Sequence, residues 1–419
     1  MYSIANKRNI GSLTATLFSP ARVFMLSSMV VNGGNYLYNI MLGRWLGPGE
    51  FAVAGLLITL LLVFSFLGMT FQITTTKFKA ELPETERSPS VHWLSKIAIY
   101  SGILCASLLI LFSVPLSKFF HMNGILSLCS FALCLPLYFS MSVSRGSLQA
   151  SEHFYMLSGS YLAEMVARIL TTIVLVLSLN ITGVSISFSI LLSVCAGLLF
   201  THLGRLPKPT LVYTLSPALR RGILTFFSVT AGYEVVQIMI NYGDMLLVKH
   251  YFDQTMAGLY TSMALVGRMI YFITWMVVMI MVPGILNKRK RGEAFLGTFY
   301  QYVAYISAFC VGTTAASYLF PEVAVTLLFG EAYLPIAPYL WMYALATSLF
   351  ALANMFIYLS LTLDKYPAVM LAAGVAVVQM ALYTEFHDSF GQILLVQIIS
   401  MAVLLSIQML YFIRIRKTI

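Results

Sequence analysis

Five charged side chains lie inside long apolar stretches of this sequence. Inserting a charge into the middle of an apolar helix of membrane length costs roughly 2.5–3.5 kcal/mol, so such residues are candidates for function. Two of the five are arginines, whose guanidinium group stays protonated and can donate two parallel hydrogen bonds to a phosphate. The chemistry that these arginines offer is therefore anion binding. The five residues are Glu164, Arg168, Glu234, Asp244 and Arg268.

Each arginine also has a structural alternative. Glu164 and Arg168 are four residues apart, so on one helix face they can neutralise each other. Arg268 has no acidic residue three or four positions away, so a partner would have to come from another helix, and Glu234 is a candidate. We expect Arg268 to line a binding cavity, with pairing to Glu234 as the alternative.

Two stripes of polar residues accompany these charges. Spacings of three and four residues place the members of each stripe on one helix face. Amide side chains carry both donors and acceptors and suit ligands rich in hydroxyl groups, while the carboxylates of one stripe are candidates for ion coupling or charge pairing. The alternative for both stripes is hydrogen bonding between helices, at ~0.6–2 kcal/mol per contact. The stripes are Ser28, Asn32, Asn35 and Asn39, and Glu234, Gln237, Asn241 and Asp244.

The elements that must position these residues are membrane-spanning helices. A bilayer core of ~30 Å requires about 20 apolar residues in a helix, and twelve segments approach or exceed that length. Hydrophobic residues make up 59% of the chain and charged residues 10%. The sequence thus predicts an all-α membrane protein with spans at Val23–Leu42, Phe51–Ile73, Ile97–Val114, Ile125–Val143, Tyr155–Leu179, Val184–Leu203, Ile223–Val248, Ala257–Leu286, Phe295–Phe320, Tyr339–Leu363, Pro367–Tyr383 and Phe390–Ile413.

Positive charge falls mainly in alternate loops, which fixes the expected orientation. By the positive-inside rule these loops are cytoplasmic, and so are both termini. The net charge of +10 then follows from topology and does not indicate nucleic-acid binding. The opposite side carries Arg44, Lys118 and Lys249. The cytoplasmic side carries Lys7, Arg8, Arg22, Lys77, Lys79, Arg87, Lys96, Arg145, Arg205, Lys208, Arg220, Arg221, Lys288, Arg289, Lys290, Arg291, Lys365, Arg414, Arg416 and Lys417.

The chain repeats itself after about half its length. Ser19-Pro20-Ala21 recurs as Ser216-Pro217-Ala218, and Ala54-Gly55-Leu56 recurs as Ala257-Gly258-Leu259. Parallel repeats of this kind frame a central site in transporters. We therefore predict two parallel six-helix lobes, residues 1–210 and 211–419, around a central cavity.

Several classes of function lack their sequence signals. No loop is long enough for a soluble catalytic or ATP-hydrolysing domain, and there is no phosphate-binding loop of the G-x-x-x-x-G-K-[ST] type. The six histidines show no metal-binding spacing, and the five cysteines lie within predicted spans. The longest predicted outer loop, Pro321–Pro338, contains only two acidic residues. We predict no catalytic residue, metal site or cofactor, and a transporter in preference to an enzyme.

Three segments carry a resemblance to a known family. In order and placement they resemble the lipid-linked oligosaccharide exporters of the multidrug/oligosaccharidyl-lipid/polysaccharide (MOP) superfamily, the bacterial polysaccharide and O-antigen flippases. The segments are Leu42–Phe51, Arg145–Ala150 followed by Phe154, Glu164 and Arg168, and Asp244–Lys249 followed by Ala257–Tyr260, Gly267 and Arg268.

The resemblance implies a cargo and roles for the candidate residues. The cargo would be an undecaprenyl-pyrophosphate-linked oligosaccharide, flipped to the outer leaflet of the bacterial inner membrane, with membrane lipids and a polysaccharide polymerase as further partners. The pyrophosphate would be bound by Arg268, Arg168 and Arg44, and the sugar by Asn32, Asn35, Asn39, Gln237, Asn241 and Trp275, although Trp275 could equally face lipid. Two alternatives remain: a multidrug or organic-cation exporter of the same fold, and a membrane polymerase or ligase acting on the same glycolipid.

Overall fold

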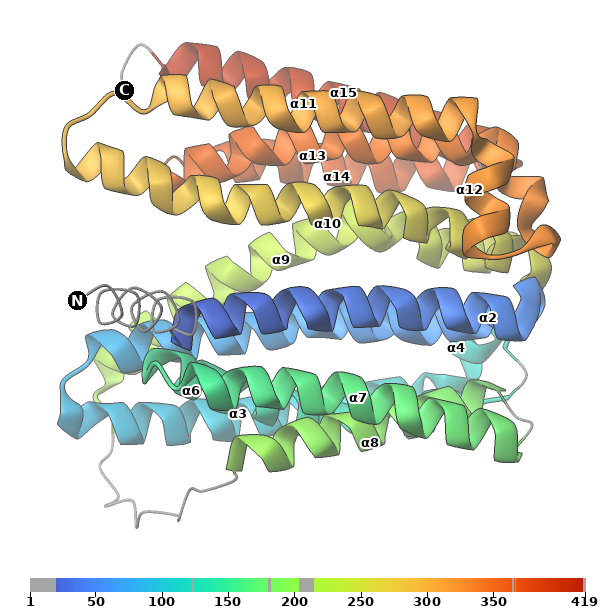
Figure 1. Ribbon diagram of the computed structural model, residues 1–419. Helices are drawn as coiled ribbons and strands as arrows, with labels where there is room; N and C mark the ends of the chain where they lie inside the picture. The colour runs from blue at the N-terminus through green and yellow to red at the C-terminus, as the bar shows by residue number, and fades with distance from the viewer. Residues whose placement is uncertain are drawn as a thin grey trace, which may run out of the picture. The chain divides into compact units, whose positions relative to one another are not determined.

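The computed structural model describes residues 20–122, 124–179, 182–202, 215–363, 365 and 367–416. In these ranges every regular element is a helix (Figure 1). The elements are α2 Pro20–Glu81, α3 Glu84–Leu111, α4 Ser113–Phe119, α5 Leu126–Ala132, α6 Cys134–Ala150, α7 Phe154–Leu179, α8 Thr182–His202, α9 Pro217–Tyr251, α10 Gln254–Lys290, α11 Leu296–Leu319, α12 Pro321–Leu328, η1 Glu331–Tyr339 (a 3₁₀ helix), α13 Leu340–Thr362, α14 Pro367–Glu385 and α15 Phe390–Ile415.

The described residues contain eleven helices long and apolar enough to cross a membrane. The first, Val23–Glu81, has 59 residues, which at 1.5 Å per residue is far more than a bilayer of ~30 Å requires. It is interrupted at Gly47, whose φ of 68° and ψ of 171° are not helical, and Pro48 follows. The first two predicted spans lie on either side of this break. The prediction of an all-α membrane protein is confirmed, while the count of twelve spans and the cytoplasmic termini stay predictions.

Two predicted segments differ in detail from the structure. The predicted span Ile125–Val143 is broken at Leu133 into α5 and α6. Pro136 lies in the first turn of α6, where its missing N–H costs little. The predicted outer loop Pro321–Pro338 is largely helical, because Pro321 begins α12 and η1 follows after Gly330, which has a φ of 97°. The segment 321–338 is therefore a folded element.

By its internal contacts the chain forms two compact units, which we describe separately. Unit 1 comprises Met1–Tyr38 and Leu57–Glu234, and unit 2 comprises Asn39–Leu56 and Val235–Ile419. The predicted lobe boundary between residues 210 and 211 lies outside the described residues. The contact-defined units divide within α2 and within α9, and the division into two six-helix lobes stays a prediction.

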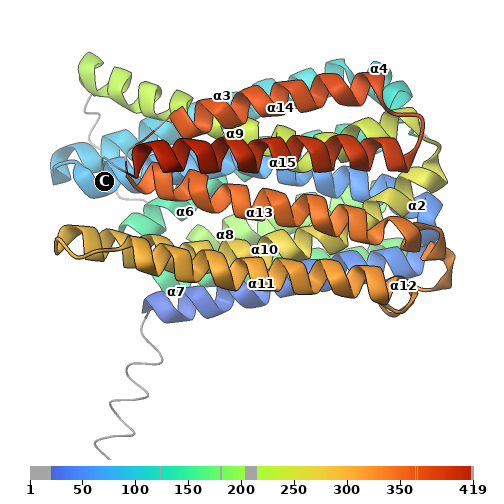
Figure 2. The same cartoon turned by 90° about the horizontal axis from the view of Figure 1, so that it is seen from above.

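Unit 1 is built around close helix packing. Helix α7 packs along α8, and α3 packs along α6 (Figures 1 and 2). A Cβ atom at Gly102 of α3 would lie 2.5 Å from the Cα atom of Pro136, so glycine is required for this approach. The rings of Phe71 and Phe227 lie 4.7 Å apart in the unit's core, which also contains Leu94, Ala98, Phe139, Val143 and Ile223.

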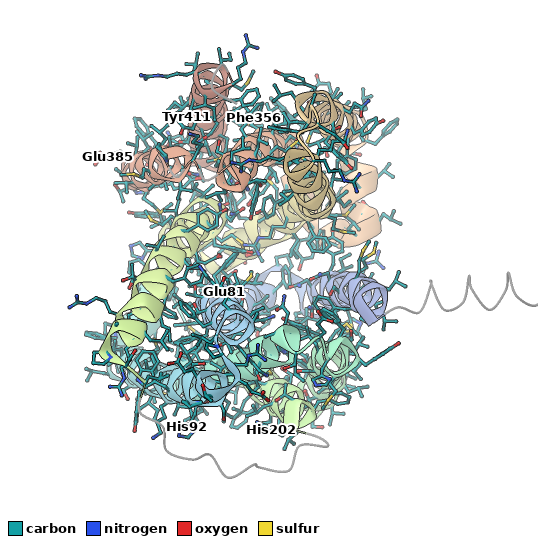
Figure 3. All side chains as sticks on the ribbon, turned by 90° about the vertical axis from the view of Figure 1, so that its left-hand side faces the viewer. Glu81, His92, His202, Phe356, Glu385 and Tyr411 are labelled. Atoms are coloured by element: carbon teal, nitrogen blue, oxygen red, sulfur yellow. The ribbon has the colours of Figure 1, made fainter. Side chains whose placement is uncertain are left out.

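Unit 2 has α13 at its centre, in contact with α10, α11 and α15. Figure 3 looks along the helices and shows side chains filling the space between the helices of each unit. The α2 segment of this unit, which contains Gly47, packs against α12 and η1. The ring of Phe51 meets that of Tyr333 edge-on at 6.3 Å, and the Tyr333 hydroxyl donates to the Gly43 carbonyl at 2.7 Å. The remaining core includes Ile285, Phe299, Met355, Phe356, Leu359 and Phe412.

Candidate functional site

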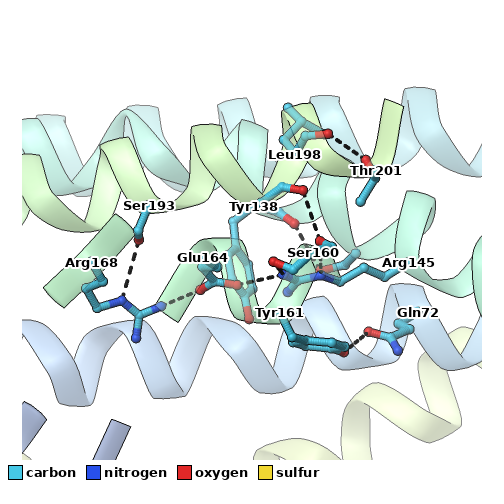
Figure 4. Close-up of polar contacts among 12 residues, drawn as sticks. Gln72, Tyr138, Arg145, Ser160, Tyr161, Glu164, Arg168, Ser193, Leu198 and Thr201 are labelled. Atoms are coloured by element: carbon cyan, nitrogen blue, oxygen red, sulfur yellow. Dashed lines mark hydrogen bonds and ion pairs between the residues drawn. The ribbon is translucent and has the colours of Figure 1, made fainter. Parts of the chain in front are cut away.

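A carboxylate shared by two arginines lies in the core of unit 1 (Figure 4). Glu164 of α7 accepts from Arg145 of α6 at 2.8 Å through one oxygen and from Arg168, one turn further along α7, through the other. The three side chains are 9%, 3% and 10% exposed, respectively. Burial of three charges is tolerated because each is paired, and the group keeps a net charge of +1.

Arg145 was expected in a cytoplasmic loop, and the structure corrects that prediction. The residue lies in α6, buried, with its guanidinium 3.9 Å from the ring centre of Tyr161. Its Nε donates to the Ser160 hydroxyl and a terminal nitrogen donates to the Ser160 carbonyl, each at 3.0 Å. Helix α6 extends seven residues past the predicted end at Val143 and carries Arg145 into the unit.

The first polar stripe meets this group at one position. Asn35 of α2 accepts from Arg168 at 3.4 Å, and Ser193 of α8 accepts from its Nε at 3.5 Å. Asn32 and Asn39 are half-buried, and Asn39 belongs to unit 2. The predicted Glu164–Arg168 pair is therefore formed, with Arg145 as a third member that the sequence reasoning missed.

Arg268 of α10 lines a small pocket inside unit 2. Its guanidinium carbon lies 4.4 Å from the ring centre of Tyr242, and a terminal nitrogen contacts the Met245 sulfur. Its Nε is buried, and no hydrogen-bond acceptor for it lies among the described residues. The pocket has about 20 Å³ for the centres of water molecules, roughly the space of one water. Its lining is Ile240, Asn241, Arg268, Tyr271, Tyr343, Ala346, Thr347, Phe350, Gln397 and Met401.

A chain of amides and a phenol leads from this pocket. Asn241 donates to the Gln237 carbonyl at 2.8 Å, and the Gln237 amide donates to Asn354 at 3.5 Å. Asn354 in turn donates to the Tyr271 hydroxyl at 3.3 Å, and the Tyr271 ring stacks on Phe350. Two members of the second predicted stripe, Gln237 and Asn241, are thus joined to the surroundings of Arg268.

The two carboxylates of that stripe have different surroundings. Asp244 is fully buried and accepts from the hydroxyls of Tyr260 and Tyr343, each at 2.9 Å, through the same oxygen. Glu234 is also buried, but it belongs to unit 1. The alternative pairing of Glu234 with Arg268 joins residues of different units and stays a prediction.

Arg44 makes the contacts of a helix cap. Its Nε donates to the Leu328 carbonyl at 3.0 Å, and one terminal nitrogen reaches the carbonyls of Thr326 and Leu327. These are carbonyls of the last turn of α12, which have no partner within the helix and attract a cation. Arg44 therefore stabilises the C-terminal end of α12 in unit 2. The side chain of Trp275, the remaining candidate, falls outside the described residues.

Sequence reasoning missed several polar residues because each is isolated in an apolar helix. Asn354 and Gln397 have no charged or amide residue three or four positions away, so no stripe like the two above marks them. In the sequence, nothing distinguishes Tyr343 from the many other aromatic core residues. A search for single amides in the most apolar spans would have found the first two, because such groups need partners there. In the searched, described residues no group of histidine, cysteine and acidic side chains could hold a metal ion.

The family follows from a comparison with known protein families. Residues 41–338 match the family described as polysaccharide biosynthesis protein. The chain belongs to this family. Its model covers more than half of the chain and spans all three segments on which the resemblance was based, so the resemblance is confirmed. No curated protein matches the sequence.

Solved structures establish the superfamily fold. The chain is similar to the lipid II flippase MurJ in an inward closed conformation, with a TM-score of 0.73 and 14% identity over 94% of this chain and 87% of that one. It is also similar to an inward-facing multidrug resistance MATE family transporter of the MOP superfamily, with a TM-score of 0.72 and 13% identity over 92% and 95%. The multidrug transporter DinF-BH matches with a TM-score of 0.65 and 13% identity over 95% and 94%.

These likenesses show a fold shared by flippases and drug exporters. The MurJ and MATE similarities are nearly equal, so the fold alone does not identify the cargo. Together with the family, they make this chain a multi-pass membrane protein of polysaccharide biosynthesis with the MOP transporter fold, a fold that in these relatives serves transport and flipping.

Proposed function

We propose that this protein flips an undecaprenyl-pyrophosphate-linked oligosaccharide from the cytoplasmic to the outer leaflet of a bacterial inner membrane. The glycolipid then serves synthesis of a surface polysaccharide such as O-antigen, capsule or exopolysaccharide. The two six-helix lobes alternate access to a cargo site near the bilayer midplane. Membership in a polysaccharide biosynthesis family and a fold shared with a lipid-linked flippase support this proposal.

The observation that supports the proposal most directly is the set of groups around the Arg268 guanidinium. A buried guanidinium normally has carboxylates or carbonyls around its donors, because an unpaired buried charge is costly. Arg268 instead has an aromatic ring, a thioether and a buried Nε donor for which the described residues offer no acceptor. A pyrophosphate would supply the acceptor that the Arg268 Nε lacks among the described residues.

The neighbouring groups suit the sugar part of the same cargo. The chain Asn241–Gln237–Asn354–Tyr271 offers amides and a hydroxyl beside Arg268. Sugar hydroxyls both donate and accept hydrogen bonds, as these groups do. The pocket has room for roughly one water, so cargo binding requires this part of unit 2 to open. Such opening is what alternating access provides.

The alternatives account less well for these residues. A multidrug exporter for organic cations would present carboxylates to its cargo, whereas the pocket presents an arginine. A polymerase or ligase acting on the same glycolipid would require catalytic groups outside the membrane, and the outer segment 321–338 contains only Glu322 and Glu331 as charged residues.

Export of surface polysaccharide by cells that depend on this protein tests the role of Arg268. Arg268→Ala should reduce export at least 100-fold while the protein remains in the membrane at normal abundance. Arg268→Lys should rescue only partly, because an ammonium group lacks the guanidinium fork. Arg291→Ala is the matched control, since Arg291 is exposed and forms a weak 3.9 Å ion pair with Glu293.

A combined substitution separates cargo binding from charge pairing. If Arg268 serves only as a partner for Glu234, each single neutral substitution should lower protein abundance. The double substitution Arg268→Ala with Glu234→Ala should then restore both abundance and export. Restored export in the double variant would contradict the pyrophosphate role.

A further inference from the structure

A second cluster of amides and aromatic rings lies in unit 1, apart from the pocket of Arg268. Gln72 of α2 accepts from the Tyr161 hydroxyl at 2.9 Å and donates to Gln149 of α6 at 3.0 Å. The ring of Phe24 lies 6.2 Å from that of Tyr161 and 5.8 Å from that of Phe154. We call these five residues the glutamine cluster.

The glutamine cluster has hydrogen-bonding capacity to spare. Gln149 accepts from Gln72 and, at 3.5 Å, from Thr76, but its own amide nitrogen donates to none of the described residues. Gln72 uses one of its two amide hydrogens. All five residues are only half-buried, so a ligand can reach the unused donors. A cluster that served only to join helices would have its amides buried and fully paired.

The glutamine cluster combines two amides and a phenol in an accessible place. A Gln149 amide nitrogen that donates to none of the described residues, within a half-buried cluster, indicates a ligand-binding surface in unit 1.

The charges next to the cluster indicate how a ligand would lie. Arg145 rests on the Tyr161 ring and belongs to the group with Glu164 and Arg168, which has a net charge of +1 (Figure 4). Arg168 lies seven residues further along α7 than Tyr161, about 10 Å at 1.5 Å per residue. The net positive charge beside the glutamines therefore favours an anionic glycolipid, whose neutral, hydroxyl-bearing part fits the glutamines.

We propose that the glutamine cluster is a binding subsite for a neutral sugar residue of the exported glycolipid. The Gln149 and Gln72 amides donate to sugar hydroxyls, and the rings of Phe24, Phe154 and Tyr161 border the apolar C–H face of the sugar. The subsite determines which oligosaccharide is accepted, while the arginines respond only to the pyrophosphate. This inference rests on the proposed function and adds sugar recognition in unit 1 to it.

The test compares two probes that differ only in their sugar. One is the glycolipid that accumulates in host cells depleted of this protein, and the other is undecaprenyl pyrophosphate alone. Binding of each to the purified full chain is measured in detergent. Gln149→Met removes the unused donors but keeps the length and helix propensity of the side chain. Because one or two hydrogen bonds are lost, it should weaken glycolipid binding about 3- to 30-fold.

The same variant should leave the affinity for undecaprenyl pyrophosphate unchanged. Tyr161→Phe removes the hydroxyl and keeps the ring under Arg145. It should also weaken binding of the glycolipid alone, because Gln72 loses the hydrogen bond from Tyr161. Gln301→Ala is the control, because Gln301 is an exposed glutamine of α11. The subsite would be overturned if Gln149→Met weakened the binding of both probes equally. It would also be overturned if the variant weakened the binding of neither probe. If neither probe binds the unmodified protein, the proposed function itself fails and the subsite fails with it.

Discussion

Removing Glu164 should destabilise unit 1 more than any surface ion pair could. Glu164 holds Arg145 at 2.8 Å and Arg168 at its other oxygen, and all three side chains are at most 10% exposed. Glu164→Ala leaves two buried cations without their shared anion. Breaking a buried pair in this way costs about 3–5 kcal/mol. The folded-to-unfolded ratio should therefore fall by roughly 100-fold to several-thousand-fold.

Unfolding of the purified protein by denaturant in mixed micelles measures this effect. Glu293→Ala is the matched control, because its 3.9 Å pair with Arg291 is 49% and 72% exposed and is worth about 0–1 kcal/mol. Replacing Arg145, Glu164 and Arg168 together by Met, Leu and Met should recover most of the stability, since apolar residues often replace buried ion groups without loss. An unfolding midpoint for Glu164→Ala equal to that of Glu293→Ala would refute the buried charge group.

Three further predictions concern the outer segment, helix packing and topology. Arg44→Ala should cost about 0.3–1 kcal/mol by uncapping α12, and hydrogen exchange over 321–339 should quicken; unchanged exchange would refute the cap. Gly258→Ala should destabilise unit 2 by about 1–3 kcal/mol, because a Cβ atom there would overlap the Pro48 carbonyl oxygen. A variant as stable as the unmodified protein would contradict this close contact. Reporters fused after Lys249 and after Arg291 should lie outside and in the cytoplasm, respectively, and the same side for both would contradict the topology.

The membrane helices could be predicted because their signal is local. An apolar run of about 20 residues specifies a span whatever surrounds it, and even the break between the first two spans is marked by Gly47 and Pro48. Helical structure in the segment 321–339 could not be predicted with the same ease. Segments α12 and η1 are short, and their stability depends on contacts from elsewhere, such as those of Arg44 and Tyr333.

The candidate site was only partly predictable, because burial is a property of the fold. Glu164 and Arg168 stand out as charges within an apolar span, and their spacing predicts their contact. Arg145 lies among serines and glycine at the end of a span, so charge counting assigns it to a loop. Only the packing of α6 on α7 makes it the third member of the group. In the same way, the partners of Asp244 come from α10 and α13, and no spacing in α9 indicates them.

Reconstituted flipping tests the central claim most directly. The purified protein is placed in liposomes with the glycolipid that accumulates in depleted cells, and an impermeant enzyme that trims the oligosaccharide reports how much is accessible outside. We predict that the unmodified protein makes the inner-leaflet glycolipid accessible, while Arg268→Ala does so at least 100-fold more slowly despite normal folding. Equal rates for the two proteins, or no flipping by the unmodified protein, would contradict the account.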